Sequence, residues 1–314
     1  MLTYSECESK WNAHWFQYIL DHPDLPWDYY WLSTNDNVTW ETVQTHPNLP
    51  WSYEGLSGNA NITWNIVQQN SDKPWSYRML SINPNITWDI VKQHPNKPWN
   101  YKWLSKMPGV ATFDIVQQNP QKTWCYHWLS SNPNITWEIV RQNPNIPWNY
   151  RLLSKNPSVA TWEIVRQNPE LPWAYNFLSV NPNITWDIIY KNPDHPWEYY
   201  YGLCLSGNPN LTWDIVQKNP DELWNYRELS RNPSVVTWEI VRQYPNMPWN
   251  YEELSANPNI DWDVVEQNPS PWWCVSGLCQ NPMTLAKQKY ILRLRQLDFA
   301  KSTLKEELMV NRFR

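Results

Sequence analysis

A unit of 24 or 25 residues recurs along almost the whole chain and constrains its fold more than any other feature. In residues 132–148 the unit reads Asn-Pro-Asn-Ile-Thr-Trp-Glu-Ile-Val-Arg-Gln-Asn-Pro-Asn-Ile-Pro-Trp. Its second tryptophan recurs in eleven units, with one longer step of 27 residues, at Trp27, Trp51, Trp75, Trp99, Trp124, Trp148, Trp173, Trp197, Trp224, Trp249 and Trp273. A fixed period in this range is typical of repeat architectures, so we expect one tandem array.

The second half of each unit predicts a short helix with its own start and stop. A threonine such as Thr136 precedes the first tryptophan and can cap the helix, and an acidic residue such as Glu138 suits the positive helix end. An Asn-Pro pair then ends the helix, because proline lacks the amide hydrogen that the helix needs. The capping positions are Thr39, Thr63, Thr87, Thr112, Thr136, Thr161, Thr185, Thr212, Thr237 and Asp261.

The first half of each unit, Trp-x-Tyr-x-x-Leu-Ser-x-Asn-Pro, predicts a second helix. The segment Pro-Asn/Asp-x-Pro-Trp precedes it, and a proline is tolerated in the first helical turn. We therefore expect the cap of this helix at Asn48, Asp72, Asn96, Asn145, Asp194 and Asn246.

Strand-based repeats fit the sequence less well. A leucine-rich horseshoe needs Leu-x-Leu-x-x-Asn in each turn, and hairpin solenoids need glycine-type turns, whereas this chain has 6 glycines and 28 prolines in 314 residues. We predict an all-α fold, an α-solenoid of about eleven two-helix repeats of 24–25 residues with capping helices at both ends. Helices of about 6 to 9 residues should cover over half of residues 27–283, in a rod or arc on the order of 100 Å long.

Three regions follow from the repeat. Residues 1–26 form an N-terminal cap with a degenerate half-repeat at Phe16 and Ile19, and Trp11 and Trp15 can cover the open apolar end. Residues 27–284 are the tryptophan-repeat solenoid. Residues 285–314 predict a basic amphipathic helix with eight basic and three acidic residues, which is either a terminal cap or a docking helix for a partner.

Insertions in the repeat give two further predictions. One extra residue in the units of Trp99, Trp148 and Trp224 should be absorbed in the turn between the two helices. The three extra residues in the segment 199–206 should lengthen or bulge the first helix of that unit.

Composition and motifs favour a protein without catalytic or cofactor sites. Phosphate loops, nucleophile elbows and metal-binding motifs are absent from the sequence, so we predict no enzyme activity, no cofactor and no metal. Five scattered cysteines favour free thiols in a reducing compartment, and Cys274 and Cys279 are expected to pack in the core. Residue stretches typical of a secretory signal or a membrane span are also missing, so we expect a cytoplasmic protein that is not secreted.

Polar residues that suggest modification or metal binding have a simpler interpretation within the repeat. The six histidines, His14, His22, His46, His94, His127 and His195, are expected in the N-terminal cap, on the surface or in turns. Six Asn-x-Thr sequons arise from the turn-plus-cap pattern and are not expected to carry glycans; they lie at Asn37, Asn61, Asn85, Asn134, Asn183 and Asn210.

The repeated motif resembles a known group of sequences. The units Asn-Pro-Asn-Ile-Thr-Trp-Asp/Glu-Ile-Val-x-x-Asn-Pro-x-x-Pro-Trp, over residues 27 to about 283, are similar to the tryptophan-rich tandem repeats encoded by large double-stranded DNA viruses. The resemblance implies a virus-encoded protein, either an interaction module in the infected host cytoplasm or a virion component. It implies no catalytic residues.

For function, the fourth and fifth residues of each first-half helix are the informative positions, because they pair basic or polar residues with large apolar ones. We predict a scaffold that binds a protein or peptide partner through one column of side chains. This aromatic column consists of Trp31, Met79, Trp103, Trp128, Leu152, Phe177 and Tyr201. Packing of these side chains on adjoining helices is the alternative interpretation.

Two other functions stay open. Basic and aromatic residues along a repeat array suit single-stranded nucleic acid, but the net charge of −5 and the pI near 5.7 disfavour it. The basic residues Lys92, Arg141, Arg166 and Arg242 each follow an acidic residue by three positions, so pairing within a helix explains them. A virion structural role remains a third possibility.

Overall fold

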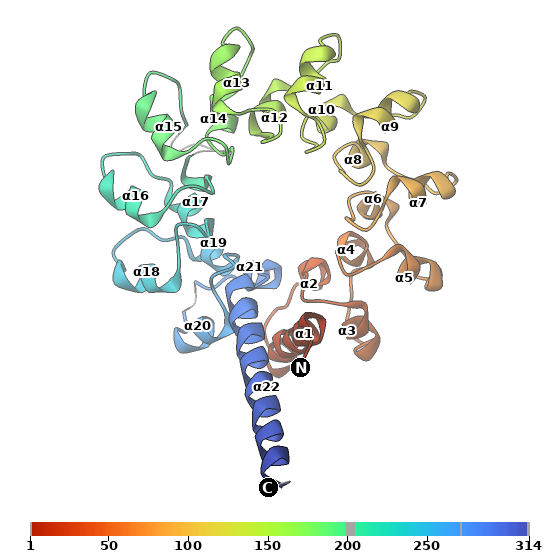
Figure 1. The fold of residues 1–314 in the computed structure, drawn as a ribbon, viewed down its shortest axis with the longest axis vertical. Helices are drawn as coiled ribbons and strands as arrows, with labels where there is room; N and C mark the ends of the chain where they lie inside the picture. The colour runs from red at the N-terminus through yellow and green to blue at the C-terminus, as the bar shows by residue number, and fades with distance from the viewer. Residues whose placement is uncertain (1, 199–204, 271, 313–314) are drawn as a thin grey trace.

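The repeats form two concentric circles of short helices (Figure 1). The computed structural model describes residues 2–198, 205–270 and 272–312, and side chains as far as Thr303; these residues contain no strand. The outer circle consists of α1 (Tyr4–Asp21), α3 (Trp40–Thr45), α5 (Trp64–Gln69), α7 (Trp88–Gln93), α9 (Phe113–Gln118), α11 (Trp137–Gln142), α13 (Trp162–Gln167), α15 (Trp186–Lys191), α16 (Trp213–Lys218), α18 (Trp238–Gln243) and α20 (Trp262–Gln267).

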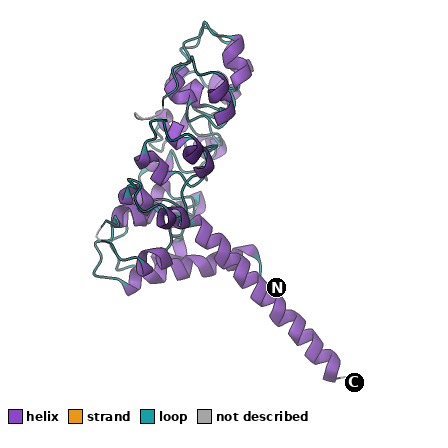
Figure 2. Cartoon of the chain, turned by 90° about the vertical axis from the view of Figure 1, so that its left-hand side faces the viewer, coloured by secondary structure: helices purple, strands orange, loops and turns teal. Residues whose placement is uncertain are grey.

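The inner circle carries the first-half helices of the units. Its members are α2 (Tyr29–Thr34), α4 (Tyr53–Gly58), α6 (Tyr77–Leu80), α8 (Tyr101–Leu104), α10 (Tyr126–Leu129), α12 (Tyr150–Lys155), α14 (Tyr175–Leu178), the 3₁₀ turn η1 (Leu205–Gly207), α17 (Tyr226–Arg231), α19 (Tyr251–Ser255) and α21 (Val275–Gln280). The long helix α22 (Thr284–Arg312) leaves the ring beside α1 and projects away from it (Figures 1 and 2).

The array is a closed ring, so the expectation of an open rod or arc is wrong. Helix α21 of the last unit lies against α2 of the first, and α22 packs on α1. One buried apolar cluster runs through this seam, since it contains Trp15 and Leu32 from the start of the repeats together with Trp262 and Leu278 from their end. The helix α1 thus stands in the place of the outer helix of the eleventh unit, between α20 and α3, rather than covering a free end.

Contacts between aromatic rings repeat around the whole circle. The aromatic residue at the start of each outer helix, or Phe16 within α1, packs on the first-half tryptophan two units further on, with centroid distances between 5.3 Å (Trp213 to Trp249) and 6.1 Å (Phe113 to Trp148). Trp262 closes the circle with Trp27 at 6.0 Å. The other pairs are Phe16–Trp51, Trp40–Trp75, Trp64–Trp99, Trp88–Trp124, Trp137–Trp173, Trp162–Trp197, Trp186–Trp224 and Trp238–Trp273.

A ladder of buried asparagines joins each unit to the one before it, except in the unit of Trp99, which has Met107 in this position. The amide of Asn83, for example, donates to the carbonyls of Ser57, Asn59 and Ile62 at 3.0, 2.8 and 3.1 Å. At the seam Asn35 donates to the carbonyls of Cys279 and Asn281 at 2.8 and 3.0 Å. The Asn-Pro asparagine therefore satisfies buried backbone acceptors, a role beyond ending the helix.

Serines of the inner helices make a second link between units. Each serine hydroxyl donates to a carbonyl four residues back and accepts the amide that starts the next inner helix, as Ser57 does from the amide of Ser76 at 2.9 Å. The last unit has Cys279 in this position, and the backbone amide of Asp28 across the seam lowers the pKa of its thiol against the larger rise that burial causes.

Helix capping follows the sequence in the outer circle and departs from it in the inner circle. Thr136 accepts the amide of Ile139, as predicted, whereas Thr185 and Thr237 occupy the cap position without that side-chain bond. The inner helices are capped by the residue after the tryptophan, such as Asn149, so the expected caps at Asn48, Asp72, Asn96, Asn145, Asp194 and Asn246 are wrong. Those residues lie in the preceding turn.

The first-half tryptophans explain this shift of the inner caps. Each indole nitrogen donates to the backbone carbonyl five residues before it, as Trp148 does to Asn143 at 3.0 Å. That carbonyl belongs to the residue that ends the outer helix. The Pro-x-x-Pro-Trp segment is thereby folded back on the outer helix as a C-cap, and no residues remain in it to begin the inner one.

The helices of the repeats are shorter than the sequence predicts, whereas the single-residue insertions lie where it predicts them. From α2 to α21 the described α-helices have four to six residues and cover less than half of residues 27–283. Both the helix length and the helical share are therefore lower than predicted. The single-residue insertions are absorbed in the turns, as predicted: both Val159 and Ala160 donate to the Asn156 carbonyl, and α13 keeps six residues. The prediction for segment 199–206 falls mostly on residues 199–204, outside the described residues.

The side-chain amides of the sequon asparagines form hydrogen bonds within the fold. Their amide groups donate to backbone carbonyls of the preceding unit, including Asn37 to Pro282 at the seam at 3.0 Å and Asn134 to Pro108 at 2.8 Å. The same holds for Asn61, Asn85, Asn183 and Asn210. A glycan on these nitrogens would remove a donor hydrogen from a contact between units.

Candidate partner-binding surface

The aromatic column lies on the inner circle of the ring. Its members Trp31, Met79, Trp103, Trp128, Leu152 and Phe177 belong to α2, α6, α8, α10, α12 and α14, and all six are half-buried. Tyr201 lies outside the described residues. The residue that follows each of the six is a leucine whose side chain is fully buried. The next position along each helix therefore belongs to the core.

Neighbouring members of the aromatic column touch across the boundaries between units. Trp103 and Trp128 stack with their ring centroids 5.6 Å apart and their planes 25° apart. Trp31 stands edge-on to Tyr30 at 5.0 Å and also packs against the core at the seam. The six described members have intermediate burial, so the column as a partner-binding site stays a prediction.

Basic side chains accompany the middle of the aromatic column. The guanidinium of Arg151 lies over the ring of Phe177 at 5.0 Å, and the ammonium of Lys106 lies over the ring of Trp128 at 5.8 Å, both within cation–π range. The surrounding cations are exposed, and within the described part of the chain no carboxylate pairs with any of them. We call this set the basic arc; it consists of Arg78, Lys102, Lys106, Arg151 and Lys155.

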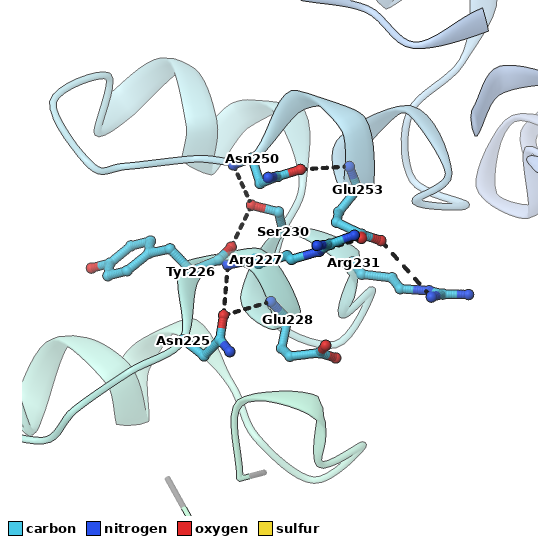
Figure 3. A network of polar contacts seen from close by, with 8 residues as sticks. All are labelled: Asn225, Tyr226, Arg227, Glu228, Ser230, Arg231, Asn250 and Glu253. Atoms are coloured by element: carbon cyan, nitrogen blue, oxygen red, sulfur yellow. Dashed lines mark hydrogen bonds and ion pairs between the residues drawn. The ribbon is translucent and has the colours of Figure 1, made fainter. Parts of the chain in front are cut away.

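The same positions later in the ring have the opposite electrostatic character. Glu253 of α19 occupies the column position and is mostly buried, with its side chain 13 % exposed. Arg227 and Arg231 of α17 approach its two carboxylate oxygens at 2.7 and 3.8 Å (Figure 3). This carboxylate raises the pKa of Arg227, first through its hydrogen bond and then through its charge. The cations of α17 are therefore neutralised within the ring.

Charge pairing on the outer helices agrees in part with the sequence. Arg141 pairs with Glu138 at 2.9 Å and Arg166 with Glu163 at 2.7 Å, three residues apart as expected. These hydrogen-bonded pairs lower the pKa of both glutamates. Among the described residues, Lys92 and Arg242 form no such ion pair with Asp89 and Glu239. Because the formed pairs are exposed, they contribute little stability.

Histidines and cysteines serve packing and turns. His94 accepts the indole hydrogen of Trp64 at 3.3 Å, and His195 stacks on Tyr175 with centroids 4.9 Å apart. Cys7 and Cys279 are buried free thiols, and Cys125 and Cys274 are half-buried free thiols. Over the described ranges, acidic, histidine and cysteine side chains nowhere gather in a group that could hold a metal ion.

Sequence reasoning missed two features of this surface. It did not place Arg231 and Lys106 beside the column, although both follow the inner-helix serine at the same offset. It also did not connect Arg227 with Glu253, because the pair spans two units. The sequence signal for this pair is the spacing of the two residues, which are 26 positions apart, one unit of 25 residues plus one.

Comparisons with protein-family models, curated proteins and solved structures find no match to this chain. None of the described helices has the length and apolar character that crossing a membrane requires.

Proposed function

We propose that this protein is a non-enzymatic scaffold whose ring binds a protein or peptide partner along the aromatic column of the inner circle. The observation that carries the proposal is the set of half-buried large side chains on the consecutive inner helices α6 to α14, of which Trp103 and Trp128 stack on one another. Aromatic residues with one face free are common anchors of protein interfaces. Short rigid helices hold them in fixed positions, which reduces the entropy lost on binding.

The recurring polar residues support a scaffold rather than a catalyst. Most of the asparagines, serines and threonines that recur in the units are used in hydrogen bonds to backbone, so their recurrence reflects assembly of the ring. The resemblance of the repeat motif to viral tryptophan-rich repeats adds a virus-encoded origin to this proposal, with the host cytoplasm or the virion as its place of action. Mass spectrometry of purified virions tests the last point.

Affinity capture with paired variants tests the proposed surface. Trp103→Ala with Trp128→Ala should abolish capture of specific partners, as measured by quantitative mass spectrometry, while leaving the helical circular dichroism unchanged. The control removes two exposed apolar residues away from the inner circle, Tyr190 and Leu223, which are 70 % and 72 % exposed. Capture that survives the first pair and is lost with the control pair would place the binding surface elsewhere.

A further inference from the structure

In the inner circle, a cation of one unit contacts the column residue of the next unit, and that residue is a carboxylate in one place and an aromatic ring in another. In three units, the second residue of the inner helix, the residue after its serine, or both reach the column residue of the following unit. Arg227 and Arg231 reach Glu253 in this way, with distances of 2.7 and 3.8 Å. Arg151 occupies the place of Arg227, but the column residue that it reaches is Phe177.

The basic arc therefore lacks the carboxylate that its geometry receives elsewhere in the ring. Lys155 stands in the place of Arg231. Lys102 and Lys106 occupy the same two places two units earlier, where Lys106 lies over Trp128. These cations are exposed, and none of them has an acidic partner among the described residues. Lys106 and Arg151 lie beside the aromatic rings of Trp128 and Phe177, which can also take up an apolar side chain.

We propose that the basic arc between Lys102 and Lys155 binds an acidic segment of a partner protein that carries interspersed apolar residues. The partner's carboxylates meet Lys102, Lys106, Arg151 and Lys155 as the carboxylate of Glu253 meets Arg227 and Arg231. Its apolar side chains contact the faces of Trp103, Trp128 and Phe177. This inference rests on the proposed function and adds the chemistry of the partner.

Charge complementarity favours an acidic protein segment over nucleic acid. The chain has a net charge of −5, and acidic residues begin most outer helices, including Glu138 and Glu163. A long polyanion would extend from the basic arc toward these charges and be repelled. A short acidic segment of about the length of three units presents its charges to the arc alone.

Peptide binding to the full chain tests the inference. The probes are a fluorescein-labelled 15-residue peptide with repeated Glu-Glu-Leu, its Lys-Lys-Leu counterpart and a 15-nucleotide oligo-dT, measured by fluorescence anisotropy. We expect the Glu-Glu-Leu peptide to bind and the lysine peptide not to bind. Arg151→Gln with Lys155→Gln should weaken binding about tenfold, since two charge contacts are lost. Lys191→Gln with Lys218→Gln makes the same charge change on the outer helices and should leave the affinity within twofold.

Two further substitutions exchange the column residues Phe177 and Glu253 and make the test decisive. Phe177→Glu supplies the missing internal carboxylate and should reduce binding as much as the loss of Arg151 and Lys155. Glu253→Phe frees Arg227 and Arg231 and should raise the affinity or add a second peptide site. Thermal unfolding monitored by circular dichroism confirms that each variant is folded.

The possible failures point to different errors. Equal affinity for the glutamate peptide in Phe177→Glu and the original chain would overturn the inference. Tighter binding of oligo-dT through the same cations would overturn it in favour of nucleic acid. If the peptide does not bind while capture of partners still depends on Trp103 and Trp128, the acidic partner is wrong and the proposed function stands.

Discussion

Removal of one seam asparagine tests whether the ring is closed in solution. Asn35→Ala deletes two hydrogen bonds to the carbonyls of Cys279 and Asn281, and Asn83→Ala deletes the equivalent contacts between two neighbouring units. Both asparagines also accept a backbone amide two residues on, Asn37 and Asn85 respectively. The two substitutions therefore differ in that one lies at the seam and in that Asn83 loses one further bond, to the Ile62 carbonyl.

The expected magnitude follows from the buried groups. Each hydrogen bond contributes about 1 kcal/mol, and a buried carbonyl left without a donor adds about 1 kcal/mol or more. Both substitutions should then lower the free energy of unfolding by about 2 to 4 kcal/mol. In an open array the amide of Asn35 would face water, and its loss would cost about 1 kcal/mol or less through the local turn alone.

Urea unfolding followed by tryptophan fluorescence and by circular dichroism gives these free energies. Hydrogen exchange of residues 275–283 adds a local measurement, because seam opening exposes their amides. If Asn35→Ala costs less than a third of Asn83→Ala and does not change exchange in 275–283, the seam is open and the closed ring is refuted.

Three further substitutions have defined outcomes. Burial raises the pKa of the Cys279 thiol from 9.0 to about 11. The folded state should therefore lose stability as pH rises from about 9 through 11. Urea titrations at pH 8 and pH 10.5 measure this loss, which Cys279→Ser should remove. Gly55→Ala should cost about 1 to 3 kcal/mol, because its new Cβ would lie 2.7 Å from the carbonyl oxygen of Tyr30, whereas Gly58→Ala meets only the flexible end of Met79 at 3.2 Å and should be near neutral in thermal unfolding. Thr136→Ala should cost about 1 kcal/mol through loss of the cap to Ile139, and equal stability to the original chain in urea would contradict that.

Local features of the fold could be predicted from the sequence because their causes are local. The threonine caps, the ends of the outer helices at Asn-Pro and the turns that absorb single insertions depend on a few adjacent residues. The inner caps were misplaced because the deciding interaction is the bond from the Trp148 indole to the Asn143 carbonyl. That bond assigns the proline segment to the outer helix, and no nearby capping pattern reveals it.

The candidate surface was only partly predictable for a similar reason. The aromatic column could be found from its composition, since surplus tryptophans gather at one repeat position. Whether a cation beside it is free or neutralised depends on the column residue of the next unit, as Arg151 and Arg227 show. A relation between residues 26 positions apart becomes visible only once the spacing between units is known.

Ring closure had no separate signal, because the seam uses the same contacts as every other boundary. An open solenoid needs terminal repeats with a polar outer face, since its end units would otherwise expose apolar surface. Trp11 and Trp15 were interpreted as such a cover. In the structure Trp15 packs on Trp262 at 5.9 Å, and the indole of Trp11 donates to Asn37 at 2.8 Å, so both belong to the boundary between the first and last units. Apolar residues at both ends of a repeat array, without a polar face to end it, are what a closed ring requires.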